Sequence, residues 1–234
     1  MKVGMIQSNY IPWRGYFDFI DDVDLFIFYD DVQYTRKDWR NRNKIKTQQG
    51  LLWLTVPVKY SMSQLVNIND ATIDYSTPWV RKHINSIKVA YSKAPFFEKY
   101  FSEFESILQI KYEKLSDLNI ALILWGMKHL NIYTETRMSS EFNPVGFRTD
   151  RIIDILKKVK ATSYLVGPAA KDYIEVDKFK NAEIALEFKK YDYAEYKQLH
   201  GSFEPNVSVM DLMFNCGDES RKYLKSVQNN EKAF

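Results

Sequence analysis

The sequence predicts an α/β protein with a Rossmann-like, mostly parallel sheet and one helical insertion at about residues 77–131. Three observations support this fold class. The first thirty residues show strand, turn, helix and strand patterns in turn, a block of purely helical patterns follows, and strand and helix patterns then alternate to about residue 217. We therefore expect residues 1–234 to form a single α/β domain that contains the insertion.

The opening unit is a strand, a turn, a helix and a second strand. Residues 2–7 (KVGMIQ) are an apolar run typical of a buried strand, and Pro12 marks a turn because proline cannot donate to a strand ladder. The apolar side chains that then recur at helical spacing are Trp13, Tyr16, Phe17 and Ile20. Residues 25–29 (LFIFY) predict the second strand, parallel to the first.

A third strand and three helices are predicted in the middle of the chain. Residues 51–58 (LLWLTVPV) indicate a strand whose end lies at an edge, because it contains Pro57. Residues 59–76 indicate a loop with a short strand near 71–73. The predicted helices begin at Pro78, after Pro95 and at a cap on Ser116, and they end near Tyr91, Leu108 and Leu130. Their aromatic stripes are typical of a hydrophobic core.

Strand and helix patterns alternate again in the last hundred residues. A strand and loop are predicted at 131–140, a helix capped by Thr149 follows, and strands are predicted at 162–167 and 183–188. Ser208 and Asp211 resemble a capping box, in which aspartate takes the place of the commoner glutamate. They predict a helix that ends near Gly217.

Composition excludes several classes of protein. The formal net charge is only +3, which is too small for an extended nucleic-acid surface. The single cysteine, Cys216, excludes a disulfide framework and fits a reducing cytoplasm, and the three histidines lie too far apart in sequence to indicate a metal site. The most apolar stretch, residues 118–125, is too short to span a bilayer, and no signal peptide is evident. We expect a cytoplasmic protein.

A first group of polar side chains falls at the predicted strand ends. Its members are Gln7, Asn9, Tyr10, Asp30, Asp31 and Gln33. Functional groups of parallel sheets gather at the carboxyl ends of the strands, and paired carboxylates there act as bases or orient hydroxyl groups. Capping of loops by Asn and Asp explains the same residues equally well.

A second candidate is the basic segment at residues 30–47, which alone carries a net charge of +3. Arg40, Arg42 and Lys46 are suited to hold a diphosphate, because arginine offers a planar fork of donors. Asn41 and Asn43 alternate with the arginines, so an extended backbone would point the two kinds of side chain to opposite faces. The pattern alone slightly favours a solvated basic hairpin.

A third candidate is His83, which shares one face of its predicted helix with Trp79 and Ile87. A histidine on an apolar face is usually a satisfied core residue. A general base is the alternative interpretation of His83.

Four runs of sequence resemble the WbqC-like proteins over nearly the whole chain. They are IQSNYIPWRGYFDFI, DLFIFYDDVQYTRKDWRNRNKIKT, WLTVPV and SFEPNVSVMDLMFNCG. The resemblance implies a place in bacterial O-antigen or other surface-polysaccharide (lipopolysaccharide) biosynthesis, and transfer of an acyl or aminoacyl group to an amino sugar. Its motif positions include the polar groups above and, further along, Tyr164, Gly167, Tyr173, Phe203, Pro205, Ser208, Asp211 and Gly217.

The opening unit is also similar to nucleotidylyltransferases of the HIGH superfamily. Residues 13–16 (WRGY) stand where that superfamily has HxGH, so both phosphate-binding histidines are absent and only Arg14 offers a partial substitute. This likeness supports a Rossmann-like sheet more than it supports nucleotidylyl transfer.

The leading hypothesis is a transferase that acts on a nucleotide-linked amino sugar, or on another phosphate-bearing small molecule, with an acyl or aminoacyl donor. The predicted catalytic side chains are His83, Asp30 and Asp31. The predicted substrate-binding side chains are Gln7, Asn9, Tyr10, Arg14, Tyr16, Gln33, Trp39, Arg40, Asn41, Arg42, Asn43 and Lys46. A nucleotidylyltransferase and a non-catalytic binding module of the glycan-assembly pathway are the alternatives. No metal ligands, no cofactor and no oligomeric state are predicted.

Overall fold

The computed structural model describes residues 1–59 and 66–234, and its centre is a six-stranded sheet with the order β5-β2-β1-β6-β7-β8. The strands are β1 (Lys2–Ile6), β2 (Leu25–Phe28), β5 (Glu135–Met138), β6 (Ser163–Val166), β7 (Ala185–Phe188) and β8 (Glu231–Lys232). The first five are parallel, and the short β8 pairs antiparallel with β7 at one edge. The predicted Rossmann-like, mostly parallel sheet is confirmed.

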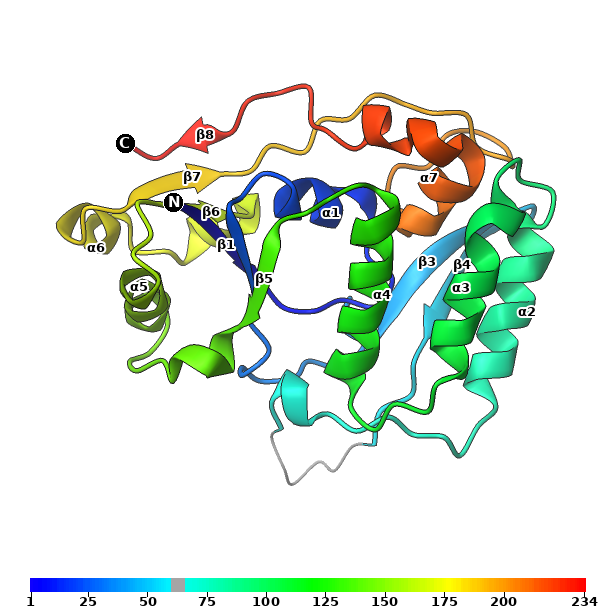
Figure 1. Cartoon of the computed structure of the whole chain (residues 1–234), viewed down its shortest axis with the longest axis horizontal. Helices are drawn as coiled ribbons and strands as arrows, with labels where there is room; N and C mark the ends of the chain where they lie inside the picture. The colour runs from blue at the N-terminus through cyan, green and yellow to red at the C-terminus, as the bar shows by residue number, and fades with distance from the viewer. Residues whose placement is uncertain (60–65) are drawn as a thin grey trace.

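Both faces of this sheet are covered, which explains why its strands are apolar throughout. In β2, Phe26 and Phe28 face one hydrophobic core, and Leu25 and Ile27 face the other. The first core also contains α1 (Arg14–Ile20) and α4 (Leu115–His129), while the second contains α5 (Thr149–Lys158) and α6 (Val176–Asn181). Figure 1 shows these layers around the sheet.

The expected helical insertion is present between the hairpin and β5. It consists of α2 (Trp79–Tyr91), α3 (Phe97–Gln109) and α4, which pack side by side next to α7 (Val209–Cys216), as Figure 1 shows. Two of the predicted helix caps are wrong by position, because Ser116 lies inside α4 and Thr149 is already the first residue of α5. The Ser208 cap is correct, since its hydroxyl accepts a hydrogen bond from the Met210 N–H at 3.3 Å.

The third predicted strand exists as β4 (Gly50–Thr55), but it does not join the main sheet. It pairs antiparallel with β3 (Arg42–Thr47), which the sequence did not establish as a strand. The polar composition of β3 hides its strand character, because the sequence shows no apolar run there. Arg42 and Lys44 of β3 lie against the Trp53 ring of β4. The predicted short strand at 71–73 is reduced to isolated bridges of Thr72 and Ile73, and residues 60–65 of the predicted loop lie outside the described residues.

Helix α1 is held very close to both of its neighbours. A Cβ added at Gly4 of β1 would lie 2.5 Å from the Phe19 ring, and one added at Gly126 of α4 would lie 2.6 Å from the Phe17 ring. Both phenylalanines are fully buried. The two glycines therefore allow α1 to pack close to both the sheet and the insertion. Helix α1 begins directly after the turn that follows β1.

We expect Gly126→Ala to lower the free energy of unfolding by about 1–3 kcal/mol, because overpacking against Phe17 outweighs the gain in helix propensity of about 1 kcal/mol. Urea denaturation measures the change. The control is Leu124→Ala on the partly exposed side of the same helix, which should change stability by less than about 0.5 kcal/mol. A Gly126→Ala protein as stable as the wild type would contradict the close approach.

Candidate functional site

Two pockets lie at the ends of the parallel strands, on the two sides of the turn that follows β1. The chain passes from β1 to β2 and β5 on one side and later returns to β6 and β7 on the other, so the strand order reverses between β1 and β6. Ligands of open α/β sheets bind at such a switch point, outside the carboxyl ends of the strands. Residues 7–13, the turn after β1, contribute to both pockets.

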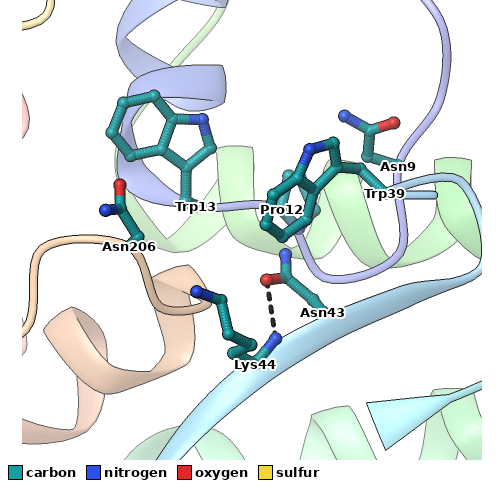
Figure 2. A pocket seen from close by; sticks show the side chains of 7 residues that line it. All are labelled: Asn9, Pro12, Trp13, Trp39, Asn43, Lys44 and Asn206. Carbon is teal, nitrogen blue, oxygen red and sulfur yellow. Dashed lines mark hydrogen bonds between the residues drawn. The ribbon is translucent and has the colours of Figure 1, made fainter. Parts of the chain in front are cut away.

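The first pocket, here called the tryptophan pocket, has a volume of about 420 Å³. It is lined by Asn9, Pro12, Trp13, Trp39, Asn43, Lys44 and Asn206. Figure 2 shows Trp13 and Trp39 on two sides of the pocket, with the Lys44 side chain extending from β3 below them toward Asn206. Elements far apart in sequence therefore build it together.

The two indoles are held by other aromatic rings. Trp13 packs against Tyr191 and Tyr193, at centroid distances of 5.2 and 5.8 Å. Trp39 lies 5.5 Å from Trp53 of β4, measured between ring centroids, and remains 42% exposed. The missing side chain of Gly15 leaves room for the Trp13 ring, because a Cβ there would lie 2.3 Å from it. The pocket walls are thus positioned before any ligand arrives.

The polar groups of the tryptophan pocket are amides and one cation. The Lys44 ammonium lies 6.0 Å from the Trp39 ring centroid and has no carboxylate partner among the described residues. Asn9 Oδ1 is buried and, within residues 1–59 and 66–234, has no hydrogen-bond donor. An unmet buried acceptor is costly, so Asn9 would gain from a donor that reached it. The pocket combines flat apolar walls, side-chain amides and one ammonium group that has no carboxylate partner in the described parts of the chain.

The turn after β1 is fixed by bonds from outside the main sheet. The Asn43 side-chain amide donates to the backbone oxygens of Tyr10 and Ile11, at 3.2 and 2.8 Å. Ile11 has φ of 36°, a left-handed conformation that costs a β-branched residue about 1–3 kcal/mol. Asn43 is therefore a positioning residue that holds the pocket wall in place.

Asp30 follows β2 and is fully buried. Its Oδ1 accepts a hydrogen bond from the Ser8 N–H at 2.7 Å, and its Oδ2 has no partner in the described parts of the chain. Burial raises the pKa of this carboxyl group, and the hydrogen bond from Ser8 and the charge of Arg40 oppose that rise. Asp30 is thus a carboxyl group that takes up a proton more readily than usual.

Asp31 differs from Asp30 because both of its oxygens are occupied. Oδ1 accepts a hydrogen bond from the Ser139 hydroxyl, and Oδ2 forms an ion pair of 2.7 Å with the guanidinium group of Arg151. Asp31 therefore connects the end of β2 to α5. This placement gives it a positioning role, and the catalytic role predicted for it stays a prediction.

The three cations expected to hold a diphosphate do not converge. Arg40 forms an ion pair of 2.7 Å with Asp38, and the Arg42 guanidinium group lies 4.2 Å above the Trp53 ring. Lys46 is buried and donates to Gln198 Oε1 at 2.7 Å and to the backbone oxygen of Ser202. Lys46 therefore points inward, and the half-buried Lys44 is the lysine of β3 that lines the pocket.

Most other predicted binding residues contact other parts of the protein and line neither pocket, as the following contacts show. The Tyr10 hydroxyl contacts His83 Nδ1 at 2.9 Å inside the core, and the Tyr16 hydroxyl donates to the backbone oxygen of Gln7 at 3.1 Å. The Asn41 amide donates to the Val56 oxygen at 2.9 Å. Gln33 lies at the surface and forms an isolated backbone bridge with Asn67.

Arg14 is buried beneath the C-terminal part of the chain. Its guanidinium group donates to the backbone oxygens of Ala194 and Tyr223, at 2.8 and 3.1 Å, and lies 4.7 Å from the Tyr193 ring centroid. It lines neither pocket. The substitution of Arg14 for phosphate-binding histidines is therefore without structural support.

His83 is buried and likewise lines neither pocket. Its Nδ1 contacts Tyr10, and burial lowers its pKa from the usual 6.5 to about 4. Both observations fit a satisfied core histidine. The general-base role stays a prediction.

The second pocket, here called the switch-point pocket, has a volume of about 410 Å³ and lies between the ends of β1 and β6 and the start of α5. Its aromatic lining consists of Tyr29, Phe147, Tyr164 and Tyr173. Gln7, Arg148, Thr149 and Arg151 supply its polar groups.

The sequence analysis identified part of the site and missed the rest. It selected Asn9, Trp39 and Asn43 for the tryptophan pocket, but not Trp13 or Lys44. Lys44 lies two residues from Arg42, and side chains two apart in a strand lie on the same face. Once β3 was recognised as a strand, this rule would have placed Lys44 beside Arg42. Asn206 and the cations of α5 carry no local signal, because the fold alone brings them to the pockets.

The described residues hold no group of three or more His, Cys, Asp or Glu side chains placed to bind a metal ion. No helix within the described ranges is long and apolar enough to cross a bilayer.

The fold class is that of a Rossmann-like α/β protein with pockets at the strand ends. The profile of the WbqC-like protein family matches residues 7–223, and the chain belongs to this family. It is 42% identical to the uncharacterized protein Rv1507c of Mycobacterium tuberculosis over 226 residues, which cover 96% of this chain and 97% of the relative. No solved structure is significantly similar. The expected family membership is confirmed.

We expect stability to depend on His83 below neutral pH. The unfolded chain takes up a proton near pH 6.5, but the folded protein does so only near pH 4, so the free energy of unfolding falls as the pH falls between these values. The loss amounts to about 3 kcal/mol at most. His83→Gln should remove this component, although it lowers stability at pH 7. Urea denaturation between pH 7 and pH 4 measures both proteins, and equal pH slopes would contradict the burial of a neutral His83.

Proposed function

We propose that this protein binds a nucleotide-linked amino sugar and transfers an acyl or aminoacyl group to the sugar amine, in bacterial surface-polysaccharide biosynthesis. The observation that carries the proposal is the tryptophan pocket, in which two indoles, three side-chain amides and the Lys44 ammonium surround about 420 Å³. Family membership supports the pathway.

The chemistry of the tryptophan pocket suits an amino sugar that carries a phosphate. The flat apolar faces of Trp13 and Trp39 complement the C–H face of a sugar ring, because contact removes both surfaces from water. The side-chain amides that line the pocket suit sugar hydroxyl and amine groups, and Lys44 suits an anionic phosphate.

In the proposed transfer, the amine nitrogen of the sugar attacks the carbonyl carbon of the donor. A C–N bond forms, the bond from that carbon to the donor's leaving group breaks, and the amine loses one proton. We assign the proton to Asp30, a buried carboxyl group whose pKa is raised by burial and whose Oδ2 has no partner among the described residues. Asp30 contacts the turn shared by both pockets through Ser8, as His83 does through Tyr10, and neither side chain lines a pocket. The raised pKa of Asp30 favours it over His83, whose pKa is lowered.

Nucleotidylyl transfer is the second candidate, and the strand order around the switch point favours it. The burial of Arg14 argues against nucleotidylyl transfer, because the Arg14 guanidinium group donates to backbone oxygens and not toward a pocket. Incubation with nucleoside triphosphate and sugar phosphate distinguishes the two, because only nucleotidylyl transfer releases pyrophosphate.

We expect Trp39→Ala and Lys44→Ala each to weaken binding of nucleotide-linked amino sugars by about ten- to a hundredfold. Trp39→Ala removes one aromatic wall of the pocket, and Lys44→Ala removes its positive charge. Isothermal titration calorimetry measures the affinity. The matched controls are Leu51→Ala on the same hairpin and Lys82→Ala on α2, which are exposed and line neither pocket. Unchanged affinity in both pocket variants would exclude the tryptophan pocket as the binding site.

We expect Asp30→Asn to lower the rate of transfer by about 10²–10⁴-fold with little change in sugar-nucleotide affinity, because the amide can still accept from Ser8 but cannot take a proton. The assay mixes the protein with nucleotide-linked amino sugars and a panel of acyl and aminoacyl donors, and mass spectrometry detects the amide product. Full activity in Asp30→Asn would remove Asp30 as the base. Binding without any product from the wild type would favour a non-catalytic binding module.

A further inference from the structure

We propose that the switch-point pocket holds the nucleoside diphosphate of the ligand, with the base among the tyrosines and the diphosphate running past Gln7 toward the tryptophan pocket. This inference rests on the proposed function in one respect, because it places the linked sugar in the tryptophan pocket. The binding of the nucleotide itself is a separate property of the second pocket.

The first argument is the position of the two pockets on one short turn. Gln7 lines the switch-point pocket and Asn9 lines the tryptophan pocket. Their Cα atoms are two residues apart and hence separated by roughly 7 Å at most. A pyrophosphate link and its ribose can cross that distance, so one ligand can reach both pockets.

The second argument is the aromatic lining of the switch-point pocket. Tyr164 is buried and stacks on Phe179, with the rings 5° from parallel, so it forms a fixed floor. Phe147 and Tyr173 are 73% and 67% exposed, although both line the pocket. Large aromatic side chains left open at a pocket are suited to stack on a planar base.

The third argument is the charge around the switch-point pocket. Arg151 is paired with Asp31, but Arg148 forms no ion pair within the described part of the chain. The charge of Arg40 acts on Tyr173 and on Asp30, where it opposes the rise in pKa of both groups. Arg40 therefore lies near the switch-point pocket on one side and follows Trp39 of the other pocket in sequence. Because Arg40 is paired with Asp38 and Arg151 with Asp31, Arg148 is the cation of the three that is left without an ion pair among the described residues to meet a diphosphate.

The test measures nucleoside diphosphates without any sugar. The probes are the diphosphates of uridine, thymidine, guanosine, cytidine and adenosine, titrated into the wild type by calorimetry. We expect at least one to bind, and we expect Tyr173→Ala and Arg148→Ala each to weaken it by about ten- to a hundredfold. The exposed positions Tyr133→Ala and Arg81→Ala are the matched controls, and neither should change the affinity.

A second comparison separates the two pockets. Trp39→Ala should leave the affinity for the free nucleoside diphosphate unchanged and weaken only the corresponding nucleotide-linked sugar. The inference is overturned if none of the diphosphates binds at millimolar concentration, or if Trp39→Ala weakens the free diphosphate while Tyr173→Ala and Arg148→Ala do not.

The outcome for the nucleotide is distinguishable from the outcome for the proposed function. Diphosphate binding that depends on Tyr173 and Arg148, together with no acyl transfer, would support the nucleotide site and reject the transferase. Acyl transfer to a nucleotide-linked sugar, with diphosphate binding insensitive to both variants, would reject the nucleotide site alone. Circular dichroism shows whether each variant is folded.

Discussion

The hydrogen bonds from Asn43 to the backbone of Tyr10 and Ile11 are the interaction on which the candidate site depends most. The β3–β4 hairpin shares no strand ladder with the main sheet, so side-chain and loop contacts must join the two. Asn43 joins them at the point where the turn after β1 adopts a strained conformation. Because the same turn forms walls of both pockets, the Asn43 amide helps to fix their relative position, together with the bond from the Ser8 N–H to Asp30.

A second buried network ties the C-terminal part of the chain to this hairpin. Asp211 accepts hydrogen bonds from the Tyr91 and Tyr196 hydroxyls, each at 2.9 Å, and Lys46 lies nearby with its ammonium on Gln198. Burial raises the pKa of Asp211. In the sequence Asp211 resembled part of a capping box, but its side chain instead connects α7 to α2 and to the segment before α7. The hairpin is therefore held from both ends of the chain.

These two networks show what the sequence could and could not predict. Strands such as β2 were predictable because their apolar runs report burial on both faces. In the insertion, α2 and α3 carry periodic apolar stripes, and α4 is apolar along most of its length. The contact of Lys46 with Gln198 could not be predicted, because Gln198 lies 152 residues further along the chain and no local pattern reports that contact. The tryptophan pocket was only partly found for the same reason, since Trp13, Lys44 and Asn206 meet only in the folded protein.

The shared turn between the pockets has a consequence for inhibitor design. Two weak fragments, one in each pocket, would lie on either side of one short turn, because Gln7 and Asn9 are only two residues apart. A short linker between them would make binding of the second fragment intramolecular, and affinity can then rise by about 10²–10⁴-fold without any new contact. The rigidity that Asn43 gives to the turn would favour a stiff linker of fixed length over a flexible one.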